Sequence, residues 1–448
     1  MTRPGRGAPP SRARPAWEYS RPDEPDPQPP SLPATRWPAV AALILSGMLA
    51  AAQIGKVPPA LPVLRHDLAL GLITAGWVAS LFSVTGATLG IVSGAIADRL
   101  GRRRLLLAGL AALALGSLLG SLSGGGAGLL VSRAIEGLGF VAIVVAAPAL
   151  IAEAAPAQHR LTLSLWSSYM PTGVAAMMLL TPPALAWIGW RGLWAASAGV
   201  ILLFLPLAAY LTRPRPDQRP RPRARSPAAA LPPGPGLRDF RAALARPGPW
   251  LLGLCFTTYT LQWSAVMAWL PTFIIGKEHT DLARAVVLTA LVVFANVPGT
   301  QFGGWLLGRG VARWRLLAAS PLCMAALALG MFATTLPDPA KYVMAIAFSG
   351  LGGVLPAACL SGVPAHARRP QEIGLVTGML VQGANLGSLC GPPLIAALVA
   401  ALGDFERAGL ALPVAAALGL ILALGVRAVE RRQARERQAL ERQVEQQA

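Results

Sequence analysis

Residues 94–104 read Gly94-Ala-Ile-Ala-Asp98-Arg99-Leu-Gly101-Arg-Arg103-Arg104, and a long apolar run lies on either side of them. The stretch therefore concentrates one aspartate and four arginines between two apolar segments. Because charged groups are costly in the hydrocarbon of a bilayer, this pattern is typical of a short loop that connects two membrane-spanning helices.

The composition of the whole chain also indicates a membrane protein. Of its 448 residues, 54% are hydrophobic and 13% are charged, whereas soluble domains carry about a quarter charged residues. Apolar runs long enough to cross a bilayer, about 20 residues each, recur along the chain. We predict an all-α membrane protein with about twelve transmembrane helices in two pseudo-symmetric six-helix bundles.

The expected spans lie at 38–60, 73–94, 104–123, 126–150, 162–185 and 193–212 in the first half, and at 248–270, 283–306, 315–335, 340–360, 373–400 and 407–427 in the second.

The segments outside the spans are rich in proline, arginine and glutamate, so they are too polar to bury a core. We expect a disordered cytoplasmic tail at 1–37, an N-terminal six-helix bundle at 38–212 and a cytoplasmic linker at 213–247. A C-terminal six-helix bundle at 248–427 and a cytoplasmic tail at 428–448, expected to be a solvated helix, complete the chain. Residues 1–36 lack the apolar region of a secretory signal.

The net charge of +19 is explained by membrane topology rather than by nucleic-acid binding. Most of the lysines and arginines fall in the tails, the linker and the loops of one side, as the positive-inside rule predicts for the cytoplasmic side. No interleaving of aromatic and basic residues accompanies them. We therefore expect a multi-pass protein of the cytoplasmic (inner) membrane, with both termini cytoplasmic and no nucleic-acid partner.

Cysteine and histidine usage argues against a metal centre. The four cysteines fall in apolar runs without a CxxC spacing, and the four histidines are expected in separate loops. No nucleophilic triad is visible, and Ser123–Gly128 is expected to be a short external turn rather than a nucleotide loop. We therefore expect neither an enzyme nor a cofactor.

The two halves of the chain look like repeats of one unit. A shift of about 210 residues places Gly173 on Gly383 and Pro182-Pro183 on Pro392-Pro393, and it also places Arg103 on Arg313. Symmetry of this kind is typical of transporters whose site lies between two bundles.

The pattern Gly94-x-x-x-Asp98-Arg99-x-Gly101-x-Arg103-Arg104, which follows the second expected span, resembles the signature loop of the major facilitator superfamily. The resemblance implies a secondary transporter that works by alternating access, usually as a monomer. It also implies that these six residues form a conformational latch for the outward-facing state. Arginines alone would serve as a topology signal, so the glycines and the acid favour the latch.

The fourth expected span contains Arg133-Ala-Ile-Glu136-Gly137-Leu-Gly139, similar to the family's fourth-span motif, whose arginine is associated with substrate or proton coupling. Arg133 and Glu136 are three residues apart and share a helix face. A buried ion pair with a purely structural role is one interpretation, and a pair that lines the transport path is the other. Glu136 is the only acid expected inside a span, so it is the candidate for proton coupling.

Lys56 is the second cation expected inside a span, and it lies between Gln53 and the pair Pro58-Pro59. The prolines predict a break in the helix, which would place Lys56 at a cavity. Alternatively, the lysine could snorkel to the membrane interface.

Aromatic and amide side chains recur where pore-lining helices are expected, and each needs a partner or water in a bilayer. Some will only hold helices together. With Gln53, Lys56 and Arg133, the substrate-binding candidates are Trp166, Tyr169, Tyr259, Gln262, Trp263, Asn296, Gln382 and Asn385.

The proline pairs at 182–183 and 392–393 are expected to kink the fifth and eleventh spans. Trp269-Leu-Pro271 and Pro59-Ala-Leu-Pro62 are also similar to the cyanate and nitroimidazole permease branch of the superfamily. That similarity implies a small polar or anionic solute.

These features favour a secondary active transporter, a symporter that takes up a small organic anion driven by H⁺. Drug efflux by the same fold is the first alternative, and it predicts an aromatic cavity with an acid. A non-transporting membrane sensor, with the linker and the C-terminal tail as its output, is the second.

Overall fold

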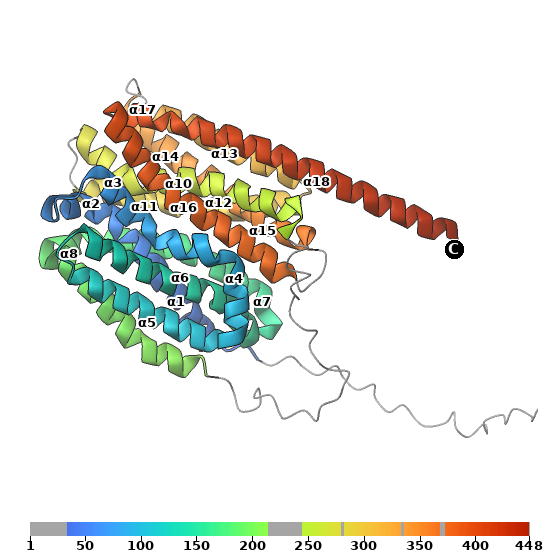
Figure 1. The fold of residues 1–448 in the computed structure, drawn as a ribbon, viewed down its shortest axis with the longest axis horizontal. Helices are drawn as coiled ribbons and strands as arrows, with labels where there is room; N and C mark the ends of the chain where they lie inside the picture. Colours follow the sequence, from blue (N-terminus) through green and yellow to red (C-terminus); the bar gives the residue numbers. More distant parts are fainter. Residues whose placement is uncertain (1–33, 214–243, 279–281, 333–335, 368–371, 448) are drawn as a thin grey trace, which may run out of the picture.

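The computed structural model describes residues 34–213, 244–278, 282–332, 336–367 and 372–447, and every regular element within them is a helix. Figure 1 shows the helices as a single elongated body from which the last helix projects. The long apolar runs form these helices because a helix satisfies its own backbone hydrogen bonds, which a bilayer cannot do.

The elements of the first half of the chain are α1 (Trp37–Gly55), α2 (Val57–Asp67), α3 (Leu72–Ser80), η2 (Leu81–Ser83), α4 (Val84–Leu100), α5 (Arg102–Ser121), α6 (Gly126–Ala154), η3 (Pro156–Gln158), α7 (His159–Ser167) and α8 (Tyr169–Leu211). The first span is interrupted once, at Lys56 between α1 and α2. The last element, α8, consists of two helical segments joined at Gly189.

The second half repeats this order with different interruptions. Its elements are α10 (Pro247–Glu278), α11 (Leu282–Phe294), α12 (Asn296–Gly308), α13 (Arg313–Phe332), α14 (Asp338–Gly352), α15 (Val354–His366), α16 (Ile373–Leu402), α17 (Phe405–Gly409) and α18 (Ala411–Gln447).

Ten helical stretches of the described residues are long and apolar enough to cross a membrane. One of them, 161–211, contains two passes, because Gly189 at φ 65° turns the chain inside α8. The helix α10 is not among the ten, although its 32 residues are sufficient for a further pass. These observations agree with the fold class expected from the sequence.

The positions of the helix breaks differ from those expected. Both proline pairs lie inside continuous helices, α8 and α16, without interrupting them, and the expected kinks at these pairs stay a prediction. The first span does break where predicted, at Lys56, immediately before Pro58-Pro59. Further breaks occur at η2, at Ala295 and at Gly353.

The two halves form two groups of helices, coloured blue to green and yellow to red in Figure 1. Between the groups, α16 packs along α3 and α4, α11 packs against α8, and α2 and α3 pack against α10. The helices α1, α7, α12 and α15 make their main contacts within their own group. The starts of α1 and α5, the ends of α6 and α8 and the projecting end of α18 lie at one end of the body, which we call the tail end.

Equivalent positions of the two halves make equivalent contacts. A Cβ atom on Gly173 would lie 2.4 Å from the backbone oxygen of Met48 in α1, and one on Gly383 would lie 2.2 Å from that of Gly253 in α10. Each glycine thus lets the fifth helix of its half approach the first.

Arginines at the tail end follow the same repeat. Arg36 and Arg246, 210 residues apart, both bind the end of the fourth pass of their half. The backbone N–H of Arg36 donates to the oxygen of Ala154 at 2.9 Å, and the guanidinium of Arg246 donates to that of His366 at 3.5 Å.

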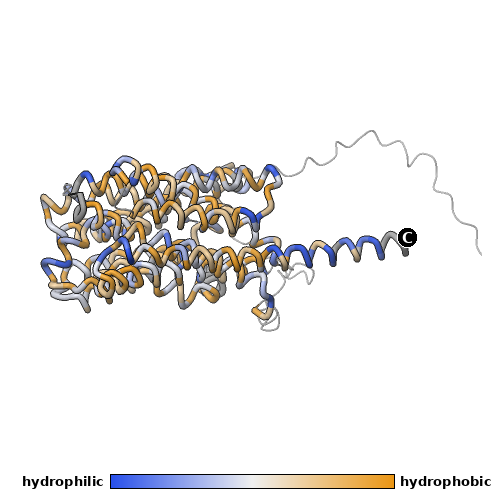
Figure 2. The backbone as a smooth tube through the Cα atoms, turned by 90° about the horizontal axis from the view of Figure 1, so that it is seen from above, coloured by the Kyte–Doolittle hydropathy of each residue, from blue (hydrophilic) through white to orange (hydrophobic). Residues whose placement is uncertain are grey.

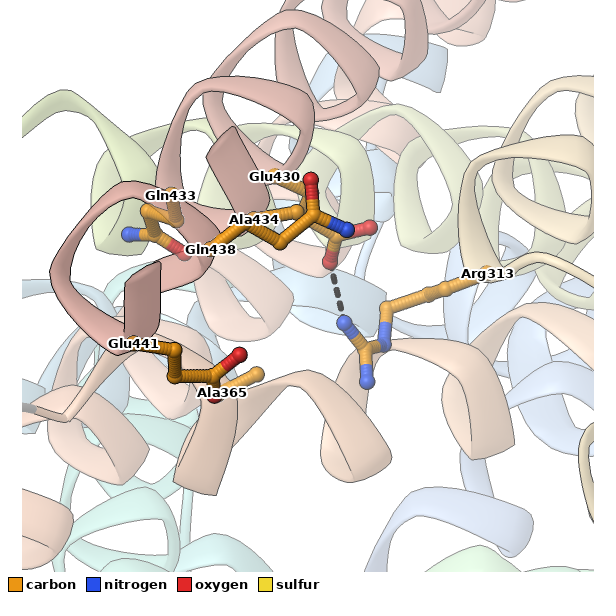
Figure 3. Close-up of a pocket in the computed structure, with 7 residues that line it drawn as sticks. All are labelled: Arg313, Ala365, Glu430, Gln433, Ala434, Gln438 and Glu441. Atoms are coloured by element: carbon orange, nitrogen blue, oxygen red, sulfur yellow. Dashed lines mark hydrogen bonds and ion pairs between the residues drawn. The ribbon is translucent and has the colours of Figure 1, made fainter. Parts of the chain in front are cut away.

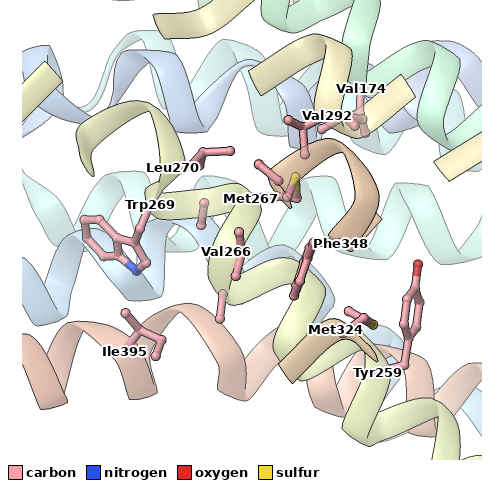
Figure 4. Packing of buried hydrophobic residues seen from close by; sticks show 14 of the residues in the cluster. Val174, Tyr259, Val266, Met267, Trp269, Leu270, Val292, Met324, Phe348 and Ile395 are labelled. Atoms are coloured by element: carbon pink, nitrogen blue, oxygen red, sulfur yellow. The ribbon is translucent and has the colours of Figure 1, made fainter. Parts of the chain in front are cut away.

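The core is apolar and packed between helices, as Figure 4 shows for Val174 of α8 beside Val292 of α11. Large apolar side chains also cover the outside: Leu203 is 80% exposed and Val414 is 70% exposed. In Figure 2 the body is mostly hydrophobic, whereas the projecting end of α18 is hydrophilic. An apolar exterior with polar ends is what a bilayer requires.

Candidate functional site

The first span is broken at Lys56, and the break aims this lysine into the first-half bundle. Its side chain is fully buried, and Nζ donates hydrogen bonds to Gln53 Oε1 at 2.6 Å, Ser117 Oγ at 2.7 Å and Glu136 Oε1 at 2.6 Å. The three N–H groups of an ammonium are thereby satisfied. The ring of Trp194 lies 4.5 Å from Nζ.

Glu136 joins two cations through its two oxygens. Oε1 accepts from Lys56, and Oε2 accepts from Nη1 of Arg133, one turn earlier on α6. The hydroxyl of Ser117 lies 2.7 Å from Oε1 of the same carboxylate. The side chains of Lys56, Arg133 and Glu136 are all 0% exposed, so this is a buried three-charge cluster.

Arg133 binds backbone oxygens that are freed by helix breaks. Its Nε donates to the oxygen of Val78 at 3.1 Å, just before η2, and Nη1 donates to the oxygen of Gln53 at 2.9 Å, just before the break at Lys56. The guanidinium lies 4.8 Å from the ring centre of Phe82. Its Nη2 has no hydrogen-bond partner among the described residues.

The cluster carries one net positive charge when all three groups are ionised. Burial of each ion costs several kcal/mol, and loss of one partner of a buried pair costs about 3–5 kcal/mol. Glu136 is therefore essential to both cations. The ionic contacts also exclude snorkelling of Lys56, one of the two alternatives left open by the sequence.

Ser117 is a member of the cluster that sequence reasoning missed. It lies in an apolar run of α5 with small residues on the same face, and a Cβ on Gly116 would lie 2.7 Å from Cγ of Glu136. The Gly-Ser pair was the available signal, because small residues mark close helix contacts in membranes.

The second-half bundle holds a smaller, uncharged polar cluster at the breaks near Ala295 and Gly353. Nδ2 of Asn296 donates to the Tyr259 hydroxyl at 2.9 Å and to the backbone oxygen of Ser349 at 3.0 Å. Nε1 of Trp263 donates to Oγ of Ser349 at 3.2 Å. The structure thus brings together three of the residues predicted for this half, along with Ser349, which was not predicted.

The other predicted residues lie apart from these clusters. Trp166 and Tyr169 stack with ring centres 4.3 Å apart. Gln262 is fully buried and donates to the Thr258 oxygen of its own helix at 3.2 Å.

Gln382 and Asn385 of α16 lie at the contact between the two groups of helices. Oε1 of Gln382 accepts from the backbone N–H of Ile91 in α4 at 3.2 Å. A Cβ on Gly86 would lie 2.2 Å from Cγ of Asn385. Both amides therefore belong to the interface rather than to either bundle interior.

The predicted latch is described only in part. Gly94, Asp98 and Arg99 fall within 93–99, whose side chains lie outside the described residues. Gly101 has φ 82° at the start of α5, Nη2 of Arg103 donates to the Ala209 oxygen within the same half at 2.6 Å, and Arg104 is exposed. The latch role stays a prediction.

At the tail end of the second half, a groove of about 410 Å³ lies between α18 and the ends of α13 and α15 (Figure 3). Arg313 pairs there with Glu430. His366 is buried, with Nε2 3.5 Å from Oε1 of Glu430. The prediction of a loop position for His366 is therefore wrong, as it is for His66 in α2.

The described residues hold no group of three or more His, Cys, Asp or Glu side chains that could bind a metal ion. All four cysteines are free, with Cys255 and Cys359 buried and the other two exposed.

The chain is similar in sequence to bacterial proteins of drug efflux, antibiotic resistance and metabolite transport. The chain is 28% identical to the multidrug efflux pump LfrA of Mycolicibacterium smegmatis over 42% of its own length and 38% of that protein. It is 27% identical to the puromycin resistance protein pur8 of Streptomyces alboniger, over 40% and 36%. A putative metabolite transport protein of Haemophilus influenzae is 26% identical, over 51% and 56%. The chain thus matches less than two thirds of each relative.

The fold is shared with a bacterial homologue of the human lysosomal transporter Spinster in an inward-facing, unoccupied conformation. The TM-score is 0.67 at 17% identity, covering 88% of this chain and 95% of the other. The similarity to the cyanate and nitroimidazole permease branch stays a prediction. The family model of the Major Facilitator Superfamily matches residues 43–380, and the chain therefore belongs to this superfamily of membrane transporters rather than to a family of enzymes.

Proposed function

We propose that this protein is a proton-coupled secondary transporter that moves a small organic anion into the cytoplasm by alternating access. The observation that carries the proposal is the buried cluster of Lys56, Arg133 and Glu136. Ionisable residues are rare inside spans and usually mark the path of a substrate or a proton. Glu136 is the only acid of this cluster, and proton coupling through the cluster therefore requires its carboxylate.

The contacts between the two groups of helices support a state that opens toward the tail end. The pairs α2–α10, α3–α10 and α8–α11 involve the helix segments remote from the tails, whereas α1, α7, α12 and α15 stay within their own group. The helix α16 packs along both α3 and α4. Rocking of the two bundles about α16 would close the tail end and open the opposite end of the body. We place the solute between the bundles.

The charge of the cluster favours an anionic solute. Two cations share one carboxylate, and Nη2 of Arg133 has no described partner. An anion that approaches Arg133 from the side of η2 would complete the neutralisation, since η2 packs against α16 of the other group. An anion that binds one conformation more tightly than the other would then shift the equilibrium toward that conformation.

The test is uptake of a panel of labelled organic anions into proteoliposomes, with and without an imposed proton gradient. We expect gradient-driven accumulation by the wild type, and its loss in Glu136→Gln. Asp338→Asn is the matched control, because it makes the same change at an acid that is 53% exposed at the start of α14. Accumulation that ignores the gradient, or survives Glu136→Gln, would contradict proton coupling through this cluster.

Export of drugs is the second candidate, and the similarity to the multidrug efflux pump LfrA and the puromycin resistance protein pur8 favours it. The uncharged cluster of Tyr259, Trp263 and Asn296 would suit an aromatic solute. Cells that express the protein would then resist cationic dyes and expel them, and the anion panel would not accumulate in the vesicles.

A further inference from the structure

We propose that Lys56, and not Glu136, is the group in the cluster that binds and releases the transported proton. The inference rests on the proposed function and assigns its proton to one atom, Nζ of Lys56. Glu136 is then a permanent counter-ion that both cations need.

The charge balance of the buried site carries this assignment. Among the described residues, Glu136 holds the only carboxylate that faces Lys56 and Arg133, so its protonation would leave two cations without a counter-ion. Loss of a proton from Lys56 leaves Arg133 and Glu136 as a neutral pair. In a medium that penalises isolated charge, the second change is the less costly one.

The neighbours of Lys56 can accommodate both of its forms. As an ammonium it donates to Gln53, Ser117 and Glu136. On release, an N–H bond breaks, the electron pair stays on Nζ and the proton passes to water. The Ser117 hydroxyl, 2.7 Å away, can then donate to the neutral amine, because a hydroxyl both donates and accepts.

The groups that face Lys56 from each surrounding element are few. They are Gln53 on α1, Ser117 on α5, Arg133 and Glu136 on α6, and Trp194 on α8. Only Arg133 and Glu136 among them are charged, and an arginine does not lose its proton in proteins.

Lys56 also lies at the joint that links the proton to conformational change. It separates α1, which packs within its own half, from α2, which also packs against α10 of the other half. Rocking of the bundles would therefore alter the angle at Lys56 and the contacts of Nζ. Proton release and bundle movement are coupled at this residue.

The first test observes the proton directly and needs no solute. The chain has only three lysines, Lys56, Lys277 and Lys341, so NMR of protein labelled with ¹³C-lysine resolves each titration, with Lys277→Arg and Lys341→Arg for assignment. We expect the Lys56 signal to change from the ammonium shift to the amine shift while the Glu136 carboxyl stays ionised. A Lys56 signal that keeps the ammonium shift while the Glu136 carboxyl titrates would overturn the assignment.

The second test uses Lys56→Arg in the proteoliposome assay, because arginine keeps the charge but cannot release the proton. We expect its anion transport to lose the response to a proton gradient. If the wild type responds and Lys56→Arg still responds equally, the assignment to Lys56 fails and the proposed function stands. If the wild type does not respond, the proposed function fails, and the lysine titration decides the inference separately.

Discussion

At the scale of single residues, Ser117 illustrates how one hydroxyl can support a buried charge cluster. Its oxygen lies within hydrogen-bond distance of three side chains, those of Gln53, Lys56 and Glu136. The loss of this hydroxyl leaves the ammonium of Lys56 with one acceptor fewer. A buried polar group without its partner costs about 1–3 kcal/mol.

We therefore predict that Ser117→Ala lowers the free energy of unfolding in detergent by about 1–3 kcal/mol. Ser46→Ala is the control, since Ser46 is also fully buried but donates only to the Ala42 oxygen of its own helix. If chemical denaturation shows the same decrease in the free energy of unfolding for both variants, Ser117 does not support the cluster.

At the scale of the helices, close contact between α6 and η2 positions Arg133. A Cβ on Gly137 would lie 2.0 Å from the backbone oxygen of Phe82, whose ring covers the guanidinium of Arg133. Only glycine fits such an approach. The conformation of η2 and the position of Arg133 thus depend on the same glycine.

Gly137→Ala should force α6 and η2 apart and lower the stability by about 1–3 kcal/mol, the usual cost of overpacking. Gly199→Ala in α8 provides the comparison, because its added Cβ meets no atom within 4 Å. That change should be neutral or stabilising by up to about 1 kcal/mol, since alanine favours helix. Equal changes in the thermal unfolding temperature of the two variants would contradict the close contact between α6 and η2.

At the scale of the whole molecule, the distribution of charge predicts the orientation in the membrane. The start of α5, the projecting end of α18 and the helix ends that border 1–33 and 214–243 lie at the tail end, and most arginines fall in or next to these stretches of the sequence. The positive-inside rule then places the tail end in the cytoplasm.

Cysteine labelling of intact cells checks this orientation in a cysteine-free background. A membrane-impermeant maleimide should label Gly124→Cys, in the exposed turn after α5, from outside. It should label Ala157→Cys, exposed in η3 at the tail end, only after permeabilisation. The reverse pattern would invert the topology, and with it the direction of the proposed transport.

Hydropathy and the polar loop residues between the apolar runs were sufficient to predict the helical architecture. Long apolar runs must become helices in a bilayer, so residues such as those of α5 and α16 could be assigned without tertiary information. The breaks were harder to predict. Pro58-Pro59 accompanies one, but Pro182-Pro183 and Pro392-Pro393 lie in continuous helices, because neighbouring helices can accommodate a proline and its freed carbonyl.

Hydropathy and the positions of the charges were enough to predict the helical class, the two repeats and the presence of Lys56, Arg133 and Glu136 inside spans. The meeting of these three charges could be seen only from the packing of the helices. Lys56 contacts Ser117 and Glu136 across 61 and 80 residues of chain, and local periodicity gives no information about which helix faces come together. That choice depends on the glycines that permit close approach and on the need of every buried charge for a partner.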